Sequence, residues 1–485
     1  MVAVEKLASI VGTKNVDQSS GTLAEFSIDQ SFVNPVRPAC IVRPGSAEQV
    51  AELIRLANET ATPLVPVSSG APHFRGDTVP GAGGAVIVDL SGMKQIMFVD
   101  RERRVAMCEP GVTFAELIPR ATAAGLRLNM PLLPRASKSV TGSILEREPV
   151  TMPKYQWDIS DPLACAGMYF GNGEEFRTGQ AAGPGSIEEQ WAVGGKQKAP
   201  YGPGTASLHR LIQGAQGSMG IVTWISMRCE LLPRLEVPQL VGCANLEPLL
   251  EMAYWLIRQR MVNECFILNQ TNLATMFGGA DVRAARTALP AWTLFYTVAG
   301  YEFFPKERVD AYLTDISTLS QRLGVDPVRS LGGISAHDIL KAAQAPSAEP
   351  YWKLVPAGGC EDVFYLTLRE KLQQQVDVMT DLAGHHSYSA TDLGVYIQPT
   401  VQGTNWHCEF NLFYDPASAR ESRQVRELSA AAIKTLMNRG AFFSRPYGEA
   451  AQEILNRDAA SVEVLHTFKK IFDPNHVMNP GKVCF

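Results

Sequence analysis

Apolar residues in the first half of the chain follow two spacings, that of an amphipathic helix and that of short buried strands. Ser46 and Gln49 form a capping box ahead of apolar positions that share one helical face, which predicts a helix there. A second capping box, Thr113 with Glu116, predicts another helix, which Gly125 ends. The apolar runs expected to form strands span residues 63–68, 85–90, 95–100 and 104–110. This alternation indicates an α/β arrangement in the first half.

The pattern changes near residues 231–238, where two prolines interrupt the chain and mark a candidate domain boundary. Beyond this point longer strands alternate with helices. The expected strands span residues 240–245, 292–302 and 361–369, and the expected helices span 247–259, 306–322 and 370–383. Residues 394–400 and 405–415 are expected to form a strand pair. Such mixing favours an antiparallel sheet with helices on one face, so the fold class is predicted to be α+β.

Composition narrows the class of protein further. The 485 residues, 46% of them apolar and 19% charged, are enough for two or three globular domains. The net charge of −5 and the absence of any Lys/Arg block argue against a nucleic-acid partner. No apolar run approaches the ~18 residues of a membrane span, and the first residues lack a secretory apolar segment. We therefore expect a cytoplasmic protein that makes no membrane contact.

The nine cysteines are scattered, odd in number and never spaced as CxxC. This pattern predicts neither a disulfide framework nor a zinc site, and it is typical of a reducing compartment. The adjacent His385 and His386 point in different directions and make a poor metal site. We expect no metal in this protein.

The common nucleotide and hydrolase motifs are missing. No GxGxxG opens a helix, and the glycine-rich residues 81–84 lead into a strand instead. Gly195 and Lys196 resemble the end of a phosphate loop, but Gln190 stands where that motif requires glycine. There is no GxSxG or HExxH sequence, so these motifs do not explain the function.

The segment from Ser68 to Gly76 is a better candidate for binding an anion. Small residues directly after a strand allow successive backbone N–H groups to converge on a phosphate, and Arg75 adds positive charge. An ordinary surface loop with a proline turn explains the same residues. The loop alone leaves both readings open.

Its sequence context favours phosphate binding. Six segments in order, at residues 68–76, 85–96, 109–117, 172–179, 216–223 and 472–482, resemble the vanillyl-alcohol oxidase and p-cresol methylhydroxylase family of flavoproteins. The resemblance covers residues 36–235 and 440–485 well and the middle of the chain loosely. It implies an FAD-binding domain at 1–235, a cap or substrate domain at 236–439, and a return of 440–485 to the first domain. FAD as cofactor and oxidoreductase activity follow from the same resemblance.

The resemblance also implies which residues hold FAD. They comprise a pyrophosphate loop, an adenosine-contacting segment, two backbone edges along the flavin and ribityl chain, and two C-terminal residues. In that order they are Ser68, Ser69, Gly70, Ala71, Pro72 and His73; Glu109, Pro110 and Gly111; Gly142, Ser143 and Ile144 with Gly220, Ile221 and Val222; and Asn479 with Lys482.

Two positions depart from the family pattern. Residues 141–149 are bulkier and more charged than the Gly/Asn/Ala-rich stretch that relatives carry near the flavin ring. Relatives with covalent FAD use a His or Tyr in the cap domain, where this chain has Asp362. His73 is another positional candidate for a link, but the preceding Pro72 departs from families that link there. Non-covalent FAD is therefore expected.

The resemblance assigns two candidate catalytic residues. Asp158 matches the aspartate beside flavin N5 in alcohol-oxidising relatives, where burial against the flavin and Trp157 would raise its pKa. A turn aspartate is the alternative. Arg445 matches an arginine near the flavin pyrimidine, where a fixed cation stabilises reduced flavin and a bound phenolate or carboxylate. Ser444 replaces the tyrosine that precedes this arginine in relatives, and Tyr447 is a candidate substitute.

Two further candidates lie in the cap. Asn405, His407 and Glu409 alternate along one strand and share a face, with apolar residues on the other. If that face looks toward the flavin, His407 and Glu409 become substrate or proton-transfer residues. A solvated sheet face is the alternative.

These features leave three functions open. The first is transfer of a hydride from an activated C–H of a 4-substituted phenol, or a related alcohol, to flavin N5. The second is a D-2-hydroxy acid dehydrogenase in which Arg445 holds the carboxylate. The third is a non-redox enzyme or scaffold with structural or lost flavin. The expected partners are a small-molecule substrate, an electron acceptor such as a cytochrome, and further copies of this chain in a homo-oligomer.

Overall fold

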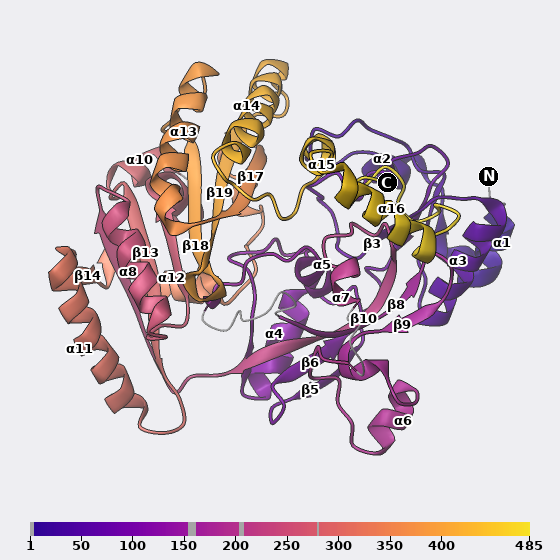
Figure 1. Ribbon diagram of the computed structural model, residues 1–485, viewed down its shortest axis with the longest axis horizontal. Coiled ribbons are helices and arrows are strands. Elements are labelled where there is room, and N and C mark those ends of the chain that lie inside the picture. Colours follow the sequence, from indigo (N-terminus) through magenta and orange to yellow (C-terminus); the bar gives the residue numbers. More distant parts are fainter. Residues whose placement is uncertain (1–3, 154–161, 203–207, 279–280) are drawn as a thin grey trace.

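The computed structural model describes residues 4–153, 162–202, 208–278 and 281–485. They form two lobes around a central space (Figure 1). The first lobe holds both chain termini and two sheets, and the second holds one large sheet with helices packed against it. The α+β fold class predicted from the sequence is confirmed.

The first sheet begins the first lobe. Its strands lie in the order β1 (Val16–Asp17), β2 (Cys40–Val42), β4 (Val86–Asp89) and β3 (Leu64–Val67). β2, β4 and β3 are parallel, as expected for an α/β arrangement. Helices α1 (Val4–Val11) and α3 (Ala47–Thr60) pack on it. α3 starts at the predicted cap, where the Ser46 hydroxyl accepts from the Gln49 backbone N–H.

The second sheet is antiparallel throughout, so the α/β expectation applies only to the first. Its strands are β5 (Ile96–Asp100), β6 (Val105–Cys108), β10 (Gly220–Leu231), β8 (Leu163–Phe170) and β9 (Glu175–Arg177), with β7 (Leu126–Leu128) beside β10. Helix α4 (Phe114–Ala123) begins at the predicted Thr113–Glu116 capping box. Gly125 follows it with φ +73°, a conformation that favours glycine. The short helices are α2 (Ser20–Glu25), α5 (Val140–Leu145), α6 (Ile187–Ala192) and α7 (His209–Ile212).

The second lobe, here called the cap, is built on a seven-stranded antiparallel sheet. Its order is β14 (Pro327–Val328), β11 (Leu235–Cys243), β13 (Trp292–Gly300), β12 (Cys265–Asn269), β18 (Leu393–Thr400), β19 (Asn405–Tyr414) and β17 (Gly359–Thr367). The predicted pairing of residues 394–400 with 405–415 is present as β18 and β19.

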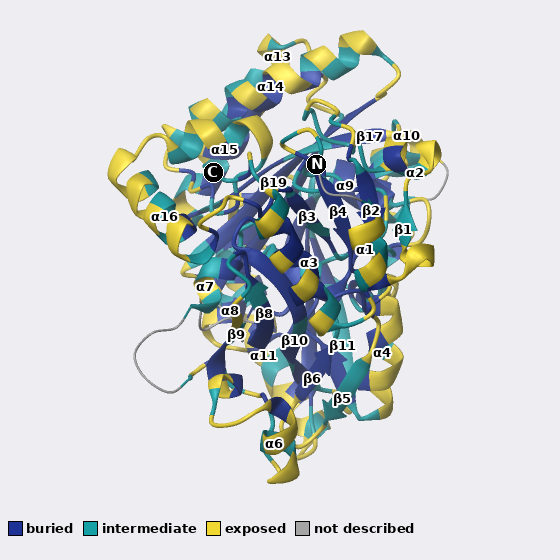
Figure 2. Cartoon of the chain, turned by 90° about the vertical axis from the view of Figure 1, so that its right-hand side faces the viewer, coloured by how far each residue is buried: buried dark blue, intermediate teal, exposed yellow. Residues whose placement is uncertain are grey.

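Helices cover the outer face of the cap sheet. These are α8 (Glu247–Arg258), α11 (Pro305–Leu323), α13 (Leu372–His385) and α14 (Ala419–Met437) (Figure 1). Trp406, Cys408 and Phe410 of β19 point into this core. Two shorter helices, α9 (Gln270–Phe277) and α12 (Ala336–Ala343), also cover part of the opposite face. Helix α10 (Val282–Thr287) and the β15–β16 hairpin (Ser330–Leu331 and Ile334–Ser335) complete the cap. The sheets are buried, whereas α13 and α14 expose one side (Figure 2).

The chain then passes back to the first lobe through α15 (Gly448–Leu455) and α16 (Ala459–Phe472). The fully buried Lys469 ammonium lies 2.6 Å from the Asp473 carboxylate and donates to the Met478 carbonyl at 2.9 Å. Asp473 in turn accepts from the Val477 and Met478 backbone N–H groups. This network fixes the last residues against β3 by a bridge between Leu64 and Met478. None of the helices in the described part of the chain is both long and apolar enough to cross a membrane.

Candidate active site

A large cavity, here called the central cavity, lies between the two lobes. Its walls come from the loop after β3, residues 134–148, the start of β10, and Tyr351, Lys353 and Asp362 of the cap. It encloses about 1300 Å³, including the space at its mouth. The cavity runs from the loop after β3 to the cap, so it is shared by both lobes.

The Ser68 and Ser69 side chains line one end of the central cavity, and Ser139 lies beside them. The Ser139 hydroxyl lies 2.9 Å from that of Ser68 and accepts from the Gly142 backbone N–H at 2.9 Å, and Ser69 accepts from the Ser139 N–H. A Cβ at Gly142 would lie 3.0–3.3 Å from all three hydroxyl oxygens. Glycine avoids this crowding where α5 approaches the loop after β3, so the serine hydroxyls can face a polar ligand there.

Unpartnered polar atoms test whether FAD suits this cavity. Among the described residues, the buried atoms His73 Nε2, Thr141 Oγ1 and Glu148 Oε2 find no hydrogen-bond partner, and all three residues line the cavity. A buried unpaired polar group costs roughly 1–3 kcal/mol, so native proteins satisfy such groups with a ligand or water. FAD, with phosphates, hydroxyls and a polar ring edge, supplies the missing partners. The residues present therefore fit the cofactor.

His73 is neutral in this environment. Burial, together with the positive charges of Arg135 and Lys138, lowers the pKa of His73 to about 3. Only 6% of the residue is exposed. A neutral His73 adds no charge here, and because Lys138 is paired with Glu146 and Glu148, Arg135 is the cation beside His73 that can meet an anionic group such as a pyrophosphate.

The structure separates the predicted FAD residues into two groups. Those that line the central cavity are Ser68, Ser69, His73, Pro110, Gly142, Gly220 and Val222. Those that do not are Gly70, Ala71, Pro72, Glu109, Gly111, Ser143, Ile144, Ile221, Asn479 and Lys482.

The second group lies behind the wall. The Asn479 amide donates to the backbone carbonyls of Asp77 and Gln216, and the Lys482 ammonium donates to that of Gly76 at 2.8 Å. These two side chains therefore hold the loops that line the cavity. Ile144 and Ile221 are core residues.

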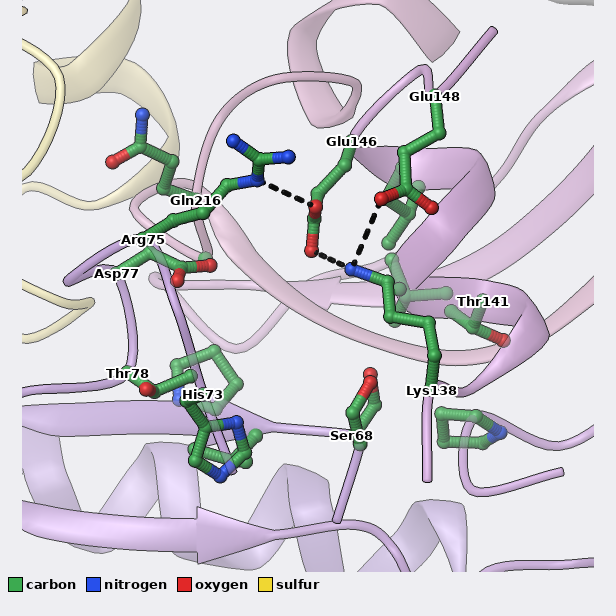
Figure 3. Close-up of a pocket in the computed structure, with 18 of the residues that line it drawn as sticks. Ser68, His73, Arg75, Asp77, Thr78, Lys138, Thr141, Glu146, Glu148 and Gln216 are labelled. Carbon is green, nitrogen blue, oxygen red and sulfur yellow. Dashed lines mark hydrogen bonds and ion pairs between the residues drawn. The ribbon is translucent and has the colours of Figure 1, made fainter. Parts of the chain in front are cut away.

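The charges of the divergent segment 141–149 are paired inside the cavity. Figure 3 shows Lys138 between Glu146 and Glu148, and the Arg75 guanidinium directed at Glu146, 3.6 Å from its carboxylate. Burial alone would raise the pKa of Glu148, but Lys138 and Arg75 outweigh it and hold that pKa below its usual value. Glu148 is therefore ionised, and both glutamates are paired with neighbouring cations, so they do not repel an anionic cofactor as unpaired charges would.

A buried ion cluster lies at the cap end of the central cavity. The Lys353 ammonium is 2.6 Å from both the Asp362 and the Glu409 carboxylates. Asn411 donates to both carboxylates at 2.7 Å. Burial alone would lower the pKa of Lys353, but the two carboxylates raise it well above its ordinary value. Sequence reasoning missed Lys353, whose only signal is its place beside two aromatic residues in the run 351–354.

His407 and Glu409 lie on the buried inner face of the cap sheet, which rules out the solvated-face reading. His407 is 1% exposed, and its Nε2 is 3.3 Å from a Glu409 carboxylate oxygen. Burial lowers the pKa of His407 despite this contact, so the imidazole is neutral near pH 7. Glu409 lines a recess of about 510 Å³ next to the central cavity, here called the cap recess, and His407 lies behind it.

Arg445 also lines the cap recess. Its guanidinium stacks 4.3 Å from the Phe364 ring centroid and donates to the Glu146 backbone carbonyl at 3.3 Å. Within the described residues it forms no ion pair, although it is only 6% exposed. Burial and the nearby Arg75 lower its pKa. A buried cation without a carboxylate partner favours an anionic ligand.

Two further expectations from the sequence concern Asp158 and metal binding. Asp158 lies outside the described residues. Among the residues that are described, no three His, Cys, Asp or Glu side chains come together as a metal site would require.

Comparisons with known proteins agree with this geometry. A family model described as an FAD binding domain matches residues 38–150. Over 517 residues the chain is 21% identical to the flavoprotein subunit of the hydroxylating 4-cresol dehydrogenase of Pseudomonas putida, covering 99% of this chain and 94% of that protein. It is 22% identical over 460 residues to the mitochondrial D-lactate dehydrogenase (cytochrome) of Arabidopsis thaliana, covering 92% and 74%. A structure of p-cresol methylhydroxylase with substrate bound superposes with a TM-score of 0.85 at 19% identity, covering 99% of this chain and 96% of that one.

The fold and the site thus define a flavoprotein: the chain carries an FAD-binding domain on a p-cresol methylhydroxylase fold. Its relatives include one named a flavoprotein subunit and others named dehydrogenases, and the chain is an FAD-dependent oxidoreductase. These matches argue against the scaffold that the sequence left open. The matches do not distinguish a phenol from a hydroxy acid as substrate, because the chain is similar both to a protein named 4-cresol dehydrogenase and to one named D-lactate dehydrogenase.

Proposed function

We propose that this enzyme oxidises an activated C–H of a 4-substituted phenol, or of a related alcohol. The observation that carries this proposal is Arg445, a buried cation in the cap recess that forms no ion pair with a described carboxylate. The recess is walled by Tyr351, Trp352 and Tyr396, with Leu132 and Met276 beside them. An aromatic ring packs well against such walls, and its phenolate oxygen then reaches the guanidinium.

A D-2-hydroxy acid is the second candidate. Its carboxylate would take the place of the phenolate at Arg445, where a guanidinium can bind two oxygens at once. Similarity to a protein named D-lactate dehydrogenase favours it. The aromatic walls favour the phenol, because a lactate-sized molecule leaves most of them uncovered.

FAD, when bound, accepts the hydride at its N5 atom. We propose that residues 1–235 and 440–485 hold it, with Ser68, Ser69 and His73 at the pyrophosphate, and that residues 236–439 carry the substrate site. Asp362, at the position where relatives link FAD through the cap, is instead paired with Lys353. FAD is therefore proposed to be non-covalent.

The cap residues Glu409 and His407 are proposed to have different roles in proton transfer. Glu409 is held ionised by Lys353, so it serves as a fixed negative charge rather than as an acid. His407, neutral and donating its Nε2–H to the Glu409 carboxylate, can accept a proton at Nδ1. Asp158 is proposed as the group that moves a proton at the reacting carbon or its oxygen.

A carrier protein such as a cytochrome is proposed to reoxidise the flavin, since one relative is named the flavoprotein subunit of a cresol dehydrogenase and another is named with a cytochrome. Homo-oligomer formation and a cytoplasmic location remain part of this proposal.

Replacing Arg445 with Met tests the anion site. Charge-assisted hydrogen bonds contribute about 1.5–3 kcal/mol, so a phenolate or carboxylate ligand is expected to bind roughly ten- to a hundredfold more weakly. A neutral analogue of the same shape should lose far less affinity, because it never used the charge. The flavin spectrum reports binding during titration of each ligand.

Arg423→Met, on the exposed side of α14, is the matched control and should change neither affinity. Equal loss for anionic and neutral ligands in Arg445→Met would assign Arg445 to holding the fold or the cofactor, and the anion-binding role would be abandoned.

A further inference from the structure

A second cavity, here called the outer cavity, adjoins the central one. It lies between β17, α14, α15 and residues 31–33, and it encloses about 1150 Å³ including its mouth. The Arg426 and Glu449 side chains, paired with each other at this mouth, are 45% and 69% exposed. The outer cavity therefore opens to solvent on a side of the molecule formed by α14 and α15.

The partition between the two cavities is one side chain thick. Phe74, Arg75, Asp362 and Tyr447 line both of them. The Arg75 guanidinium stacks 4.4 Å from the Phe364 ring centroid and 5.3 Å from that of Tyr447. Side chains that pack by stacking can shift by rotamer changes, without moving any backbone hydrogen bond.

Arg445 joins the outer cavity to the proposed reaction site. It lines the outer cavity and the cap recess alike. When the anionic group of a ligand binds this guanidinium in the cap recess, the outer cavity therefore lies directly beyond that group.

The walls of the outer cavity are mostly apolar. Five apolar side chains from four separate segments face it, namely Phe32, Val363, Ile433, Phe443 and Ile454. Its carboxylates are Asp362 in the partition, Glu361, which accepts from the Ser429 hydroxyl at 3.2 Å, and Glu449 and Glu453, which belong to α15. Among the described residues that line the cavity, Arg426 is the cation on the side away from the partition. The cavity thus suits an apolar group and disfavours a negative charge at its outer end.

We propose that the outer cavity is a distal subsite for an extended phenol, which holds an apolar substituent attached beside the phenolate oxygen that Arg445 binds. This inference rests on the proposed function, because it takes the phenolate at Arg445 as its starting point. The substituent passes between the cap recess and the outer cavity beside Arg75 and Arg445, which line both, and lies against Ile433 and Phe443.

Two probes that differ only in this substituent test the subsite: 4-ethylphenol and 4-ethyl-2-hexylphenol. Calorimetric titration of the FAD-loaded enzyme, with its flavin chemically reduced beforehand under anaerobic conditions, measures binding without turnover. Burying five or six methylene groups is expected to tighten binding on the order of a hundredfold, after part of the gain is lost to ordering the chain. A third probe that ends the same chain in a carboxylate should lose this gain, because the Glu449 and Glu453 carboxylates lie at the outer end of the cavity and repel it.

Two variants fill the outer cavity. Ile433→Trp fills its wall, and Ala430→Trp adds bulk at an exposed lining position where a large residue does not disturb the core. Both should abolish the advantage of the hexyl chain and leave 4-ethylphenol binding unchanged. Lys434→Trp adds the same bulk at the exposed position next to Ile433, outside the cavity lining, and should keep the advantage.

Equal affinity for the two phenols, or an equal loss in Lys434→Trp, would overturn the subsite. Flavin reduction, measured separately, distinguishes this failure from failure of the proposed function. If both phenols reduce the flavin but bind equally, only the subsite is wrong. If the chain-length effect is present and neither phenol reduces the flavin, phenol oxidation is wrong and the subsite stands.

Discussion

Lys353→Met is expected to destabilise the enzyme by about 3–5 kcal/mol, because it removes the cation from a buried ion cluster. The Lys353 side chain is 8% exposed, and its partners Asp362 and Glu409 are 13% and 11% exposed. Methionine keeps most of the volume, so the loss reports the uncompensated carboxylates rather than a void. Chemical denaturation of wild type and variant measures the difference as a shift of the unfolding midpoint.

The pH dependence of this loss has a definite sign. In the wild type, Lys353 holds the pKa of Glu409 well below its usual value against the effect of burial. The stabilisation is therefore fully present above the unfolded-state pKa of about 4.3 and is lost as pH falls through the folded-state value. Without Lys353, burial raises the pKa of Glu409 instead, so the variant should lose stability as pH rises above about 4.3.

A second substitution separates this cause from a general packing defect. Adding Glu409→Gln to Lys353→Met removes one of the stranded charges and should recover part of the stability, so the two effects are not additive. Additive losses, or a variant whose stability does not depend on pH, would contradict the ion cluster.

Asp158→Ala is expected to lower the rate of flavin reduction ~10²–10⁴-fold, the usual contribution of a positioned acid or base. FAD content should change little, because the proposed role is proton transfer and not cofactor binding. Anaerobic single-turnover mixing with a substrate that reduces the wild type measures the rate. This proposal rests on the resemblance of the sequence around Tyr155, Trp157 and Asp158 to alcohol-oxidising flavoproteins.

Asp158→Asn is the matched variant, since it keeps the shape of the carboxylate but cannot take up a proton. It should be nearly as slow as the alanine variant. A single-turnover rate equal to that of wild type in either variant would make Asp158 a turn residue.

Local features of this fold could be predicted from the sequence because they depend on neighbouring residues. The capping boxes at Ser46 and Thr113 start helices where expected, and Gly125 ends one of them. Residues 394–400 and 405–415 were predicted from the sequence to pair as strands, and they do so as β18 and β19. Which strands become neighbours in a sheet depends on contacts between distant segments, and the antiparallel second sheet was not expected.

The site was harder to predict for the same reason. Lys353 meets Glu409 across 56 residues, and nothing in its own segment indicates a carboxylate partner. The resemblance to the family located the loops of the central cavity but did not show which side chains enter it. Asn479 and Lys482 were predicted to contact FAD, and in the structure their side chains donate to backbone carbonyls. The alternation along β19 did indicate that His407 and Glu409 share a face of the strand. That face is buried because the other lobe lies against it, which the sequence of β19 alone does not show.

The most direct test of the central claim is anaerobic flavin bleaching. Purified enzyme should be yellow, and acid precipitation should release its FAD into the supernatant. Addition of a 4-alkylphenol without oxygen should then remove the visible flavin absorption within a single turnover, while D-lactate leaves it unchanged. If D-lactate bleaches the flavin and the phenols do not, the substrate is a hydroxy acid rather than a phenol. A flavin that stays yellow with every phenol and hydroxy acid, or whose colour remains in the washed acid pellet, would contradict the account.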